Sequence, residues 1–258
     1  MLRDIHQLRD APPYGMVALE GLTAAEAAFE TTTKFVPYCP EHINVWSPQF
    51  AQIIMDCASQ IDSLWKAVEQ TQTPPSSNKK LTIQDHWVRY RSLVATQKVI
   101  FFGGPNPAVI EPFLAWNDLS FRSPDWWQAY NKLKHDRFSN QTSATMSHAL
   151  HAVAGLLLAI VYSGACDLAL ISTQLLDTSK NGYNPWAFTD TGLLRDLPYE
   201  CRSIIDTRIF AHPLGVFGGS DCNLSHWWDS HSTRFNIWWA LNSDNYTTIN
   251  PPLAKTED

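Results

Sequence analysis

The sequence lacks an excess of positive charge. Its 258 residues include 19 Lys and Arg against 25 Asp and Glu, which gives a formal net charge of −6. A chain with this balance has no overall electrostatic field that attracts nucleic acid. Any nucleic-acid site in this protein must therefore be a local cluster of cationic side chains.

Paired cysteines are also missing. The five Cys residues are scattered, odd in number, and contain no Cys-x-x-Cys pair. This usage predicts reduced thiols in a cytoplasm-like compartment. The N-terminus is charged, with Arg3, Asp4 and Arg9, and it has no signal-peptide core. Both observations predict a cytoplasmic protein.

The most apolar run is too short to span a membrane. It extends over eleven residues from Ala152 to Tyr162, whereas a transmembrane helix needs about 20. Apolar residues at helical spacing already begin at Met146, and Thr142 or Ser143 is available as the N-cap. The sequence therefore predicts the central buried helix of a bundle, and no membrane partner.

Other segments also predict helices. Ser47-Pro48 is a favourable helix start, and the clearest 3-4 spacing of apolar residues follows it as far as Val68. Thr82 and Asp85 resemble a capping pair. The remaining expected helices lie at Leu19–Phe29, Trp87–Phe101, in part of Pro107–Leu119, at Cys166–Asp177, near Tyr199–Phe210 and at Ser230–Leu241.

The fold class expected from these patterns is mainly α, an antiparallel helical bundle with an irregular C-terminal elaboration. Residues 1–40 are weakly patterned and form an N-terminal extension, and residues 41–178 form the bundle. In residues 179–258, Gly and Pro recur every few positions while Trp, Phe and Tyr continue among them. This composition predicts an irregular segment that packs on the bundle.

A polar helix with two different faces is predicted directly before the apolar run. Ser123 can serve as the N-cap, and Pro124 suits the first helical position. At about 100° per residue, one face of this helix is aromatic and can pack. The other face presents an amide, an ammonium and an imidazole within one or two turns, from Asn131, Lys134 and His135.

The string Trp-Trp-x-x-Tyr-Asn-x-x-Lys-His-Asp-Arg at 126–137, followed by an Ala-rich apolar helix, resembles the HEPN superfamily. It is similar to uncharacterised bacterial HEPN-like proteins, and the resemblance covers roughly residues 45–165. The resemblance implies a helical bundle that interacts with RNA or a nucleotide in a bacterial defence or toxin–antitoxin setting. It also implies a homodimer in which two motifs face one cleft, and an antitoxin-like protein partner.

Metal-independent RNA cleavage is the reaction that this resemblance implies. His135 matches the family histidine and would be the general acid or base, because imidazole titrates near neutral pH. Asn131 would orient this ring or bind a phosphate oxygen, and Arg137 would supply positive charge. Lys134 and Trp127 would bind the RNA or nucleotide. This reaction requires no cofactor and no metal ion.

One departure from the family pattern keeps a second interpretation open. The Arg-x4-6-His motif of the family's ribonucleases is not intact, since the corresponding positions hold Tyr130, Ala129 and Gln128. The alternative is a non-catalytic helical module for dimerisation or protein binding. In that case His135 has a structural role, and Lys134 and Arg137 are solvated surface charges. Trp126 and Trp127 are then aromatic residues of the core or of a dimer contact rather than stacking platforms for bases.

Two further groups contain residue types that bind metals. His148 and His151 have i, i+3 spacing but no Asp or Glu one turn away, so we expect them to lie in the core. Cys222, His226 and His231 offer zinc-ligand types without a second Cys nearby, which favours no metal there.

Overall fold

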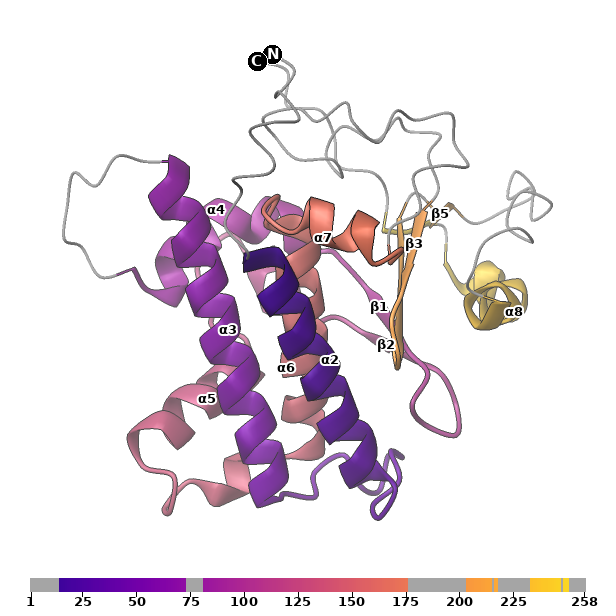
Figure 1. Cartoon of the computed structure of the whole chain (residues 1–258). Coiled ribbons are helices and arrows are strands. Elements are labelled where there is room, and N and C mark those ends of the chain that lie inside the picture. Colours follow the sequence, from indigo (N-terminus) through magenta and orange to yellow (C-terminus); the bar gives the residue numbers. More distant parts are fainter. Residues whose placement is uncertain are drawn as a thin grey trace.

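The structure is a computed structural model that describes residues 14–72, 81–175, 203–214, 216–217, 233–246 and 248–250. These residues form seven α-helices, a four-stranded antiparallel sheet and a two-stranded sheet (Figure 1). The prediction of a mainly helical chain is therefore confirmed, whereas the four-stranded sheet was not predicted.

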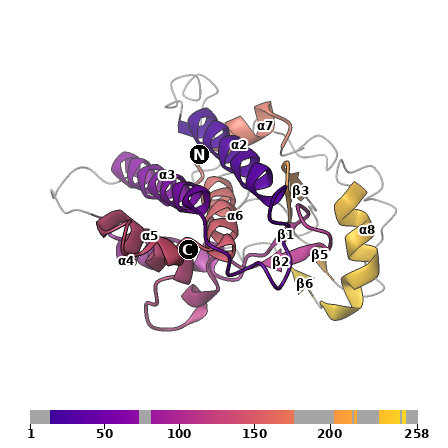
Figure 2. The ribbon, with the colours of Figure 1, turned by 90° about the horizontal axis from the view of Figure 1, so that it is seen from below.

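Helix α6 (Met146–Tyr162) is the central element of the helical part. It contacts α2 (Tyr14–Thr33), α3 (Pro48–Gln72), α4 (Ile83–Val94) and α5 (Asp125–His135). Figures 1 and 2 show α2, α3 and α6 side by side, with α5 next to α3. Every residue from 152 to 162 is buried, which agrees with the prediction that the apolar run forms a buried central helix.

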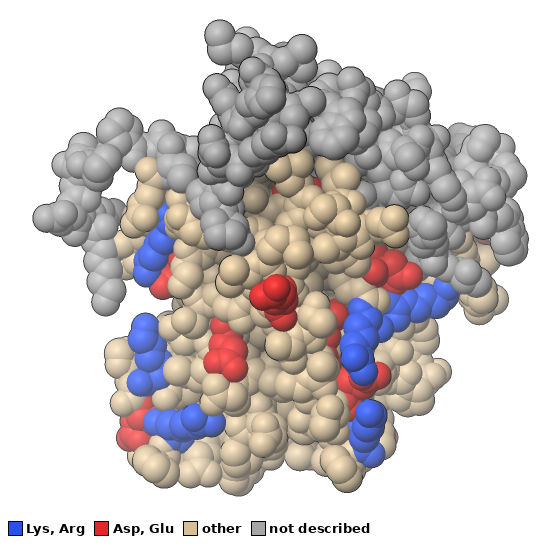
Figure 3. All heavy atoms as spheres, viewed as in Figure 1, with Lys and Arg blue, Asp and Glu red and all other residues tan. Residues whose placement is uncertain are grey.

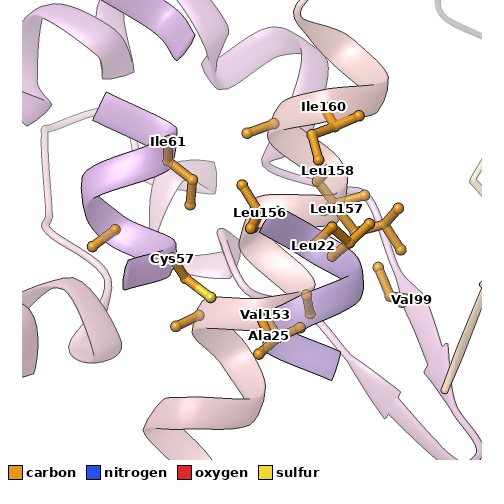
Figure 4. Packing of buried hydrophobic residues seen from close by; sticks show 14 of the residues in the cluster. Leu22, Ala25, Cys57, Ile61, Val99, Val153, Leu156, Leu157, Leu158 and Ile160 are labelled. Atoms are coloured by element: carbon orange, nitrogen blue, oxygen red, sulfur yellow. The ribbon is translucent and has the colours of Figure 1, made fainter. Parts of the chain in front are cut away.

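One large hydrophobic cluster joins these helices. Apolar residues of the two helices with the clearest 3-4 spacing belong to it, among them Ile54, Ile61, Leu150, Val153 and Leu157. Figure 4 shows that side chains from α2, α3, α6 and a neighbouring strand converge in this cluster. The 3-4 spacing along the sequence therefore identified residues of one continuous core.

The predicted helix starts are right at two places. At the start of α3, the Ser47 hydroxyl accepts a hydrogen bond of 3.1 Å from the Gln49 amide. At the start of α4, the Thr82 amide donates to the Asp85 carboxylate at 2.8 Å, within a complete capping box. Polar side chains at these positions satisfy amides that lack partners within the helix.

Two other helices begin later than predicted. The N-cap of α6 is Thr145, whose hydroxyl accepts from the His148 amide at 3.2 Å, and the predicted caps Thr142 and Ser143 form a short 3₁₀ turn. In α5 the N-cap is Pro124 rather than Ser123. Each start is shifted to the residue that adopts the extended backbone required before a helix.

The lengths of two helices differ from the prediction, and a third helix agrees with it. Helix α2 extends beyond the predicted Leu19–Phe29 at both ends, and Gly15 at its start lies against Ala169 of α7 (Asp167–Ser172). Helix α7 occupies only the first part of the segment predicted as helix at 166–177. Helix α8 (Thr233–Asn242) confirms the predicted helix near the C-terminus.

One predicted helix is too long and another is wrong, because their segments contain β-strands. Helix α4 ends at Val94, and β1 (Val99–Phe101) follows where the helix was expected to continue. The segment predicted as a helix near 199–210 holds β3 (Ser203–Asp206) and the start of β4 (Phe210–Leu214). Short runs of β-branched and aromatic residues suit strands, and periodicity alone does not distinguish such runs from buried helices.

The four strands form one antiparallel sheet in the order β2-β1-β4-β3, with β2 spanning Ala108–Ile110. Within β1, Ile100 pairs with Ala211 of β4 and Phe101 pairs with Phe210. Val99 and Phe101 belong to the large cluster, whereas Ile100 belongs to a second cluster with residues of α8. This alternation follows from the period of two along a strand.

The sheet therefore separates two hydrophobic clusters. Helices lie on one side, and α8 packs on the other side through Phe235, Trp238 and Trp239. Figures 1 and 2 show the sheet between α6 and α8. A second antiparallel pair, β5 (Val216–Phe217) with β6 (Thr248–Ile249), lies near this layer.

Candidate functional site

The sequence-predicted site lies at the C-terminal end of α5. His135 is the last residue of this helix, and Lys134, His135 and Arg137 are all exposed. The loop that follows runs beside the segment before α3, because the Ser47 amide donates to Ala144 O at 3.2 Å. The site therefore lies where the α5–α6 connection meets the start of α3.

The end of α5 provides a favourable position for cations. Lys132, Lys134 and His135 occupy its last turn, where the helix dipole presents partial negative charge. The Lys134 ammonium also lies 5.2 Å from the centroid of the Tyr130 ring. These interactions explain the basic residues without a ligand, yet they leave the ammonium group accessible to solvent.

The residues after His135 hold the loop in place. The side chain of Asn140 caps the end of the helix, since its Nδ2 atom donates to Asp136 O at 2.8 Å and to Lys132 O at 3.3 Å. Arg137 donates to Pro48 O at 3.3 Å, which connects the loop to the first turn of α3. The remaining donors of this exposed guanidinium can still meet an anion.

A carboxylate stands directly beside His135. Hydrogen bonds from the hydroxyl and the backbone amide of Ser139 lower the pKa of Asp136. The hydrogen bond from the Ser139 amide nitrogen to Asp136 Oδ1 is 3.1 Å long. Asp136 is therefore ionised at neutral pH and adds a negative charge to the cluster. On the face of the molecule that Figure 3 shows, Lys and Arg side chains likewise lie beside Asp and Glu side chains in small groups.

The other two predicted residues are less accessible. Trp127 is 3% exposed, and its ring packs edge-on against the rings of Trp126 and Tyr130. The distances between ring centroids are 5.3 Å to Trp126 and 5.4 Å to Tyr130. This ring therefore belongs to the core and offers no open face for base stacking. Asn131 is half-buried one turn before His135. The exposed ring nearest in sequence is Phe138, which is 87% exposed.

The histidines of α6 were expected to lie in the core, but both are only half-buried, and each ring lies against a backbone carbonyl. Nδ1 of His148 lies 2.8 Å from Ser143 O, and Nδ1 of His151 lies 2.8 Å from Ser147 O. Burial lowers the pKa of His151. Among the described residues, no group of three or more His, Cys, Asp or Glu side chains could hold a metal ion.

The other metal-type group, Cys222 with His226 and His231, lies outside the described residues. The expectation that no metal binds there therefore stays a prediction. Within the part of the chain that the structure describes, no helix is long and apolar enough to cross a membrane.

A buried polar cluster at the end of α6 was not predicted. The Tyr162 hydroxyl donates to Gln97 Oε1 at 2.7 Å and lies 3.0 Å from His212 Nε2. Nδ1 of His212 lies 2.9 Å from Lys98 O, and Asn250 bonds the amide and the carbonyl of Lys98 at 2.6 Å each. Burial lowers the pKa of His212 to about 4, so its ring is neutral at neutral pH.

This cluster connects α6 to β4 and to the residue after β6. Two of its hydrogen-bonded residues, Lys98 and Asn250, are 152 positions apart in the sequence, so no local spacing could have revealed it. All four side chains are nearly inaccessible, and they satisfy one another's hydrogen bonds. The cluster therefore joins the helical part to the sheet rather than forming an open site.

The comparisons with known proteins add no family to this description. No protein-family model, no curated protein and no solved structure matches the chain.

Proposed function

We propose that this protein is a HEPN-like RNA- or nucleotide-interacting protein with a helical bundle fold, and that it binds its ligand at the exposed end of α5. The observation that carries the proposal is the joint exposure of Lys134, His135 and Arg137 at one helix end. Two fixed cations can bind phosphate oxygens, and the imidazole can donate or accept a proton. Phe138 supplies an exposed ring for a base.

The net charge of the chain limits what this site can bind. Because the protein carries a charge of −6 and Asp136 lies inside the cluster, long-range attraction to nucleic acid is small. Binding must therefore depend on a few short-range phosphate contacts. A short, accessible strand or a nucleotide meets this requirement better than an extended duplex.

Cleavage of RNA by this site would need a second copy of the chain. The reaction needs one group that removes the 2′-hydroxyl proton and another that protonates the leaving oxygen. The α5 end supplies one imidazole, His135, and the family arginine is replaced. We therefore propose a homodimer in which two α5 ends lie near the two-fold axis and share one cleft.

The cellular setting that fits this proposal is a cytoplasmic one, in bacterial defence or a toxin–antitoxin pair with an antitoxin-like partner. The support for this setting is the resemblance of residues 126–137 to bacterial HEPN-like proteins.

Binding of a short single-stranded RNA, followed by fluorescence anisotropy, tests the site. Lys134→Ala and Arg137→Ala should each weaken binding, and each should reduce the slope of log K against log salt by about 0.7, because each removes one phosphate contact. Arg122→Ala is the matched control, since Arg122 is 62% exposed near the opposite end of α5. Equal effects of all three variants, or no binding by the wild type, would reject the proposed site.

The second candidate is a non-catalytic module for dimerisation or protein binding. It is favoured by the contact of Arg137 with Pro48 O and by the position of Lys134 over the Tyr130 ring. Arg137 would then stabilise the loop and Lys134 the end of α5, and neither would bind a ligand. Under this alternative, Arg137→Ala lowers the melting temperature and leaves RNA binding unchanged.

A further inference from the structure

Helices α3 and α4 are joined by a group of charged side chains that the proposed RNA site does not use, in which one buried histidine meets half-buried side chains of α3. His86 of α4 is fully buried and lies between two carboxylates of α3. Its Nδ1 atom is 3.1 Å from Glu69 Oε1, and its Nε2 atom is 3.2 Å from Asp62 Oδ1. The Lys66 ammonium donates to the other oxygen of Asp62.

The hydrogen bonds define the protonation state of the ring. Ionised carboxylates only accept hydrogen bonds, so an imidazole that bonds carboxylates through both nitrogens must carry two protons and a positive charge. Burial raises the pKa of Asp62, but hydrogen bonds from His86 and Lys66 outweigh it, so the net pKa is lowered and Asp62 is ionised. Two cations then balance Asp62 and Glu69, which reduces the cost of burying these charges.

The rest of the surroundings of His86 is mostly aromatic. The centroid of its ring lies 5.2 Å from that of Trp65 and 6.4 Å from that of Tyr90. The neighbouring charges of α4 are engaged with other groups, since Asp85 accepts from Thr82 and Arg89 lies over the Tyr90 ring.

The other elements that pack on α4 also have their titratable groups bonded elsewhere. In α6, His148 and His151 lie against carbonyls near the start of their own helix, and Tyr162 donates to Gln97. The 3₁₀ turn η1 (Leu114–Asn117) contributes Trp116, which packs at 5.9 Å from Trp65. Asp62, Lys66 and Glu69 are therefore the charges that decide the state of His86.

We propose that Asp62, His86 and Glu69 form a proton-controlled latch that holds α4 against α3. With two protons on its ring, His86 of α4 donates hydrogen bonds to two carboxylates, Asp62 and Glu69, that are two turns apart on α3. When the ring loses a proton, a nitrogen lone pair faces a carboxylate oxygen in a buried place, and that contact becomes repulsive.

The sign of the pH dependence follows from linkage. The two contacts of the ring stabilise the folded state only while both ring nitrogens carry protons, so this stability is lost when the pH rises far enough to remove one of them. The contribution of Asp62, whose pKa is lowered, is present above the ordinary value and is lost as the pH falls. The hydrogen bonds of His86 with Asp62 and Glu69 therefore stabilise the packing of α4 on α3 near neutral pH, and this stabilisation is lost at both acidic and alkaline pH.

The direct test is the protonation of the His86 ring in the full-length protein at about pH 8, where an ordinary histidine is neutral. Imidazole ¹⁵N spectra of the wild type should show two protonated ring nitrogens for one histidine, and His86→Gln should remove that signal. A wild-type His86 with one unprotonated nitrogen at this pH overturns the latch.

A second variant keeps the proposal testable if His86→Gln does not fold. Glu69→Gln preserves the shape of the side chain and removes one negative charge next to Nδ1 of His86. The ring should then lose a proton at lower pH than in the wild type, and the alkaline fall in melting temperature should shift in the same direction. The exposed Glu20→Gln on α2 is the control and should leave both profiles unchanged. Identical profiles for Glu69→Gln and the wild type would overturn the latch.

Discussion

Two glycines within helices should respond in opposite ways to the same substitution. A Cβ atom at Gly155 of α6 would lie 2.9 Å from Cζ2 and 3.3 Å from Cη2 of Trp126. The Trp126 ring cannot move aside, because it is 2% exposed and its indole nitrogen donates to Pro112 O at 2.7 Å. A Cβ atom at Gly21 of α2 would meet only the end of the Gln60 side chain, which can rotate.

The magnitudes follow from two opposing effects. Alanine in place of glycine within a helix adds about 1 kcal/mol of stability. Overpacking a rigid core costs about 1–3 kcal/mol. We therefore expect Gly155→Ala to lower the free energy of unfolding by up to about 2 kcal/mol, and Gly21→Ala to raise it by up to about 1 kcal/mol.

Urea denaturation followed by far-UV circular dichroism measures both changes, and the two variants serve as controls for each other. If Gly155→Ala is as stable as Gly21→Ala, then α5 does not pack against α6 through Trp126 as described.

Three other predictions concern the core, the pH dependence and the assembly. Leu157 is fully buried, so Leu157→Ala should cost about 2–5 kcal/mol in urea denaturation, and an unchanged unfolding midpoint would contradict its place in the core. Because the pKa of His212 is lowered from 6.5 to about 4, the free energy of unfolding should fall by about 3 kcal/mol as the pH drops through this interval. His212→Gln should flatten that acid profile, and the same slope in both proteins would contradict a buried neutral ring. Light scattering should show a homodimer, and a monomer at micromolar concentration would remove the shared-cleft mechanism.

Helices with long amphipathic patterns could be predicted from the sequence, because burial of one face repeats every three to four residues. The start of α3 at Pro48 and the capping box of Thr82 are local features that depend on few neighbours. The strands could not be predicted in this way. Val99 to Phe101 is a short apolar run, and only its pairing with Ala108–Ile110 and with β4 makes it a strand.

The candidate site was predictable in its position and not in its accessibility. The order of residues in α5 placed His135 and Lys134 near each other at the helix end, and the structure leaves both exposed. The same order left two roles open for Trp127, a packed ring or a stacking platform, and the structure places this ring in the core. His86 and its carboxylate partners stayed undetected, since they are 17 and 24 residues apart in sequence.

The central claim is that the exposed end of α5 binds RNA or a nucleotide, and an NMR titration tests it most directly. Backbone amide signals of the full-length protein are followed while a short single-stranded RNA is added in the presence of a metal chelator. The account predicts that the largest shifts fall on residues 131–140 and that Lys134→Ala weakens them. Shifts confined to other parts of the chain, or none at saturating RNA, would contradict the claim.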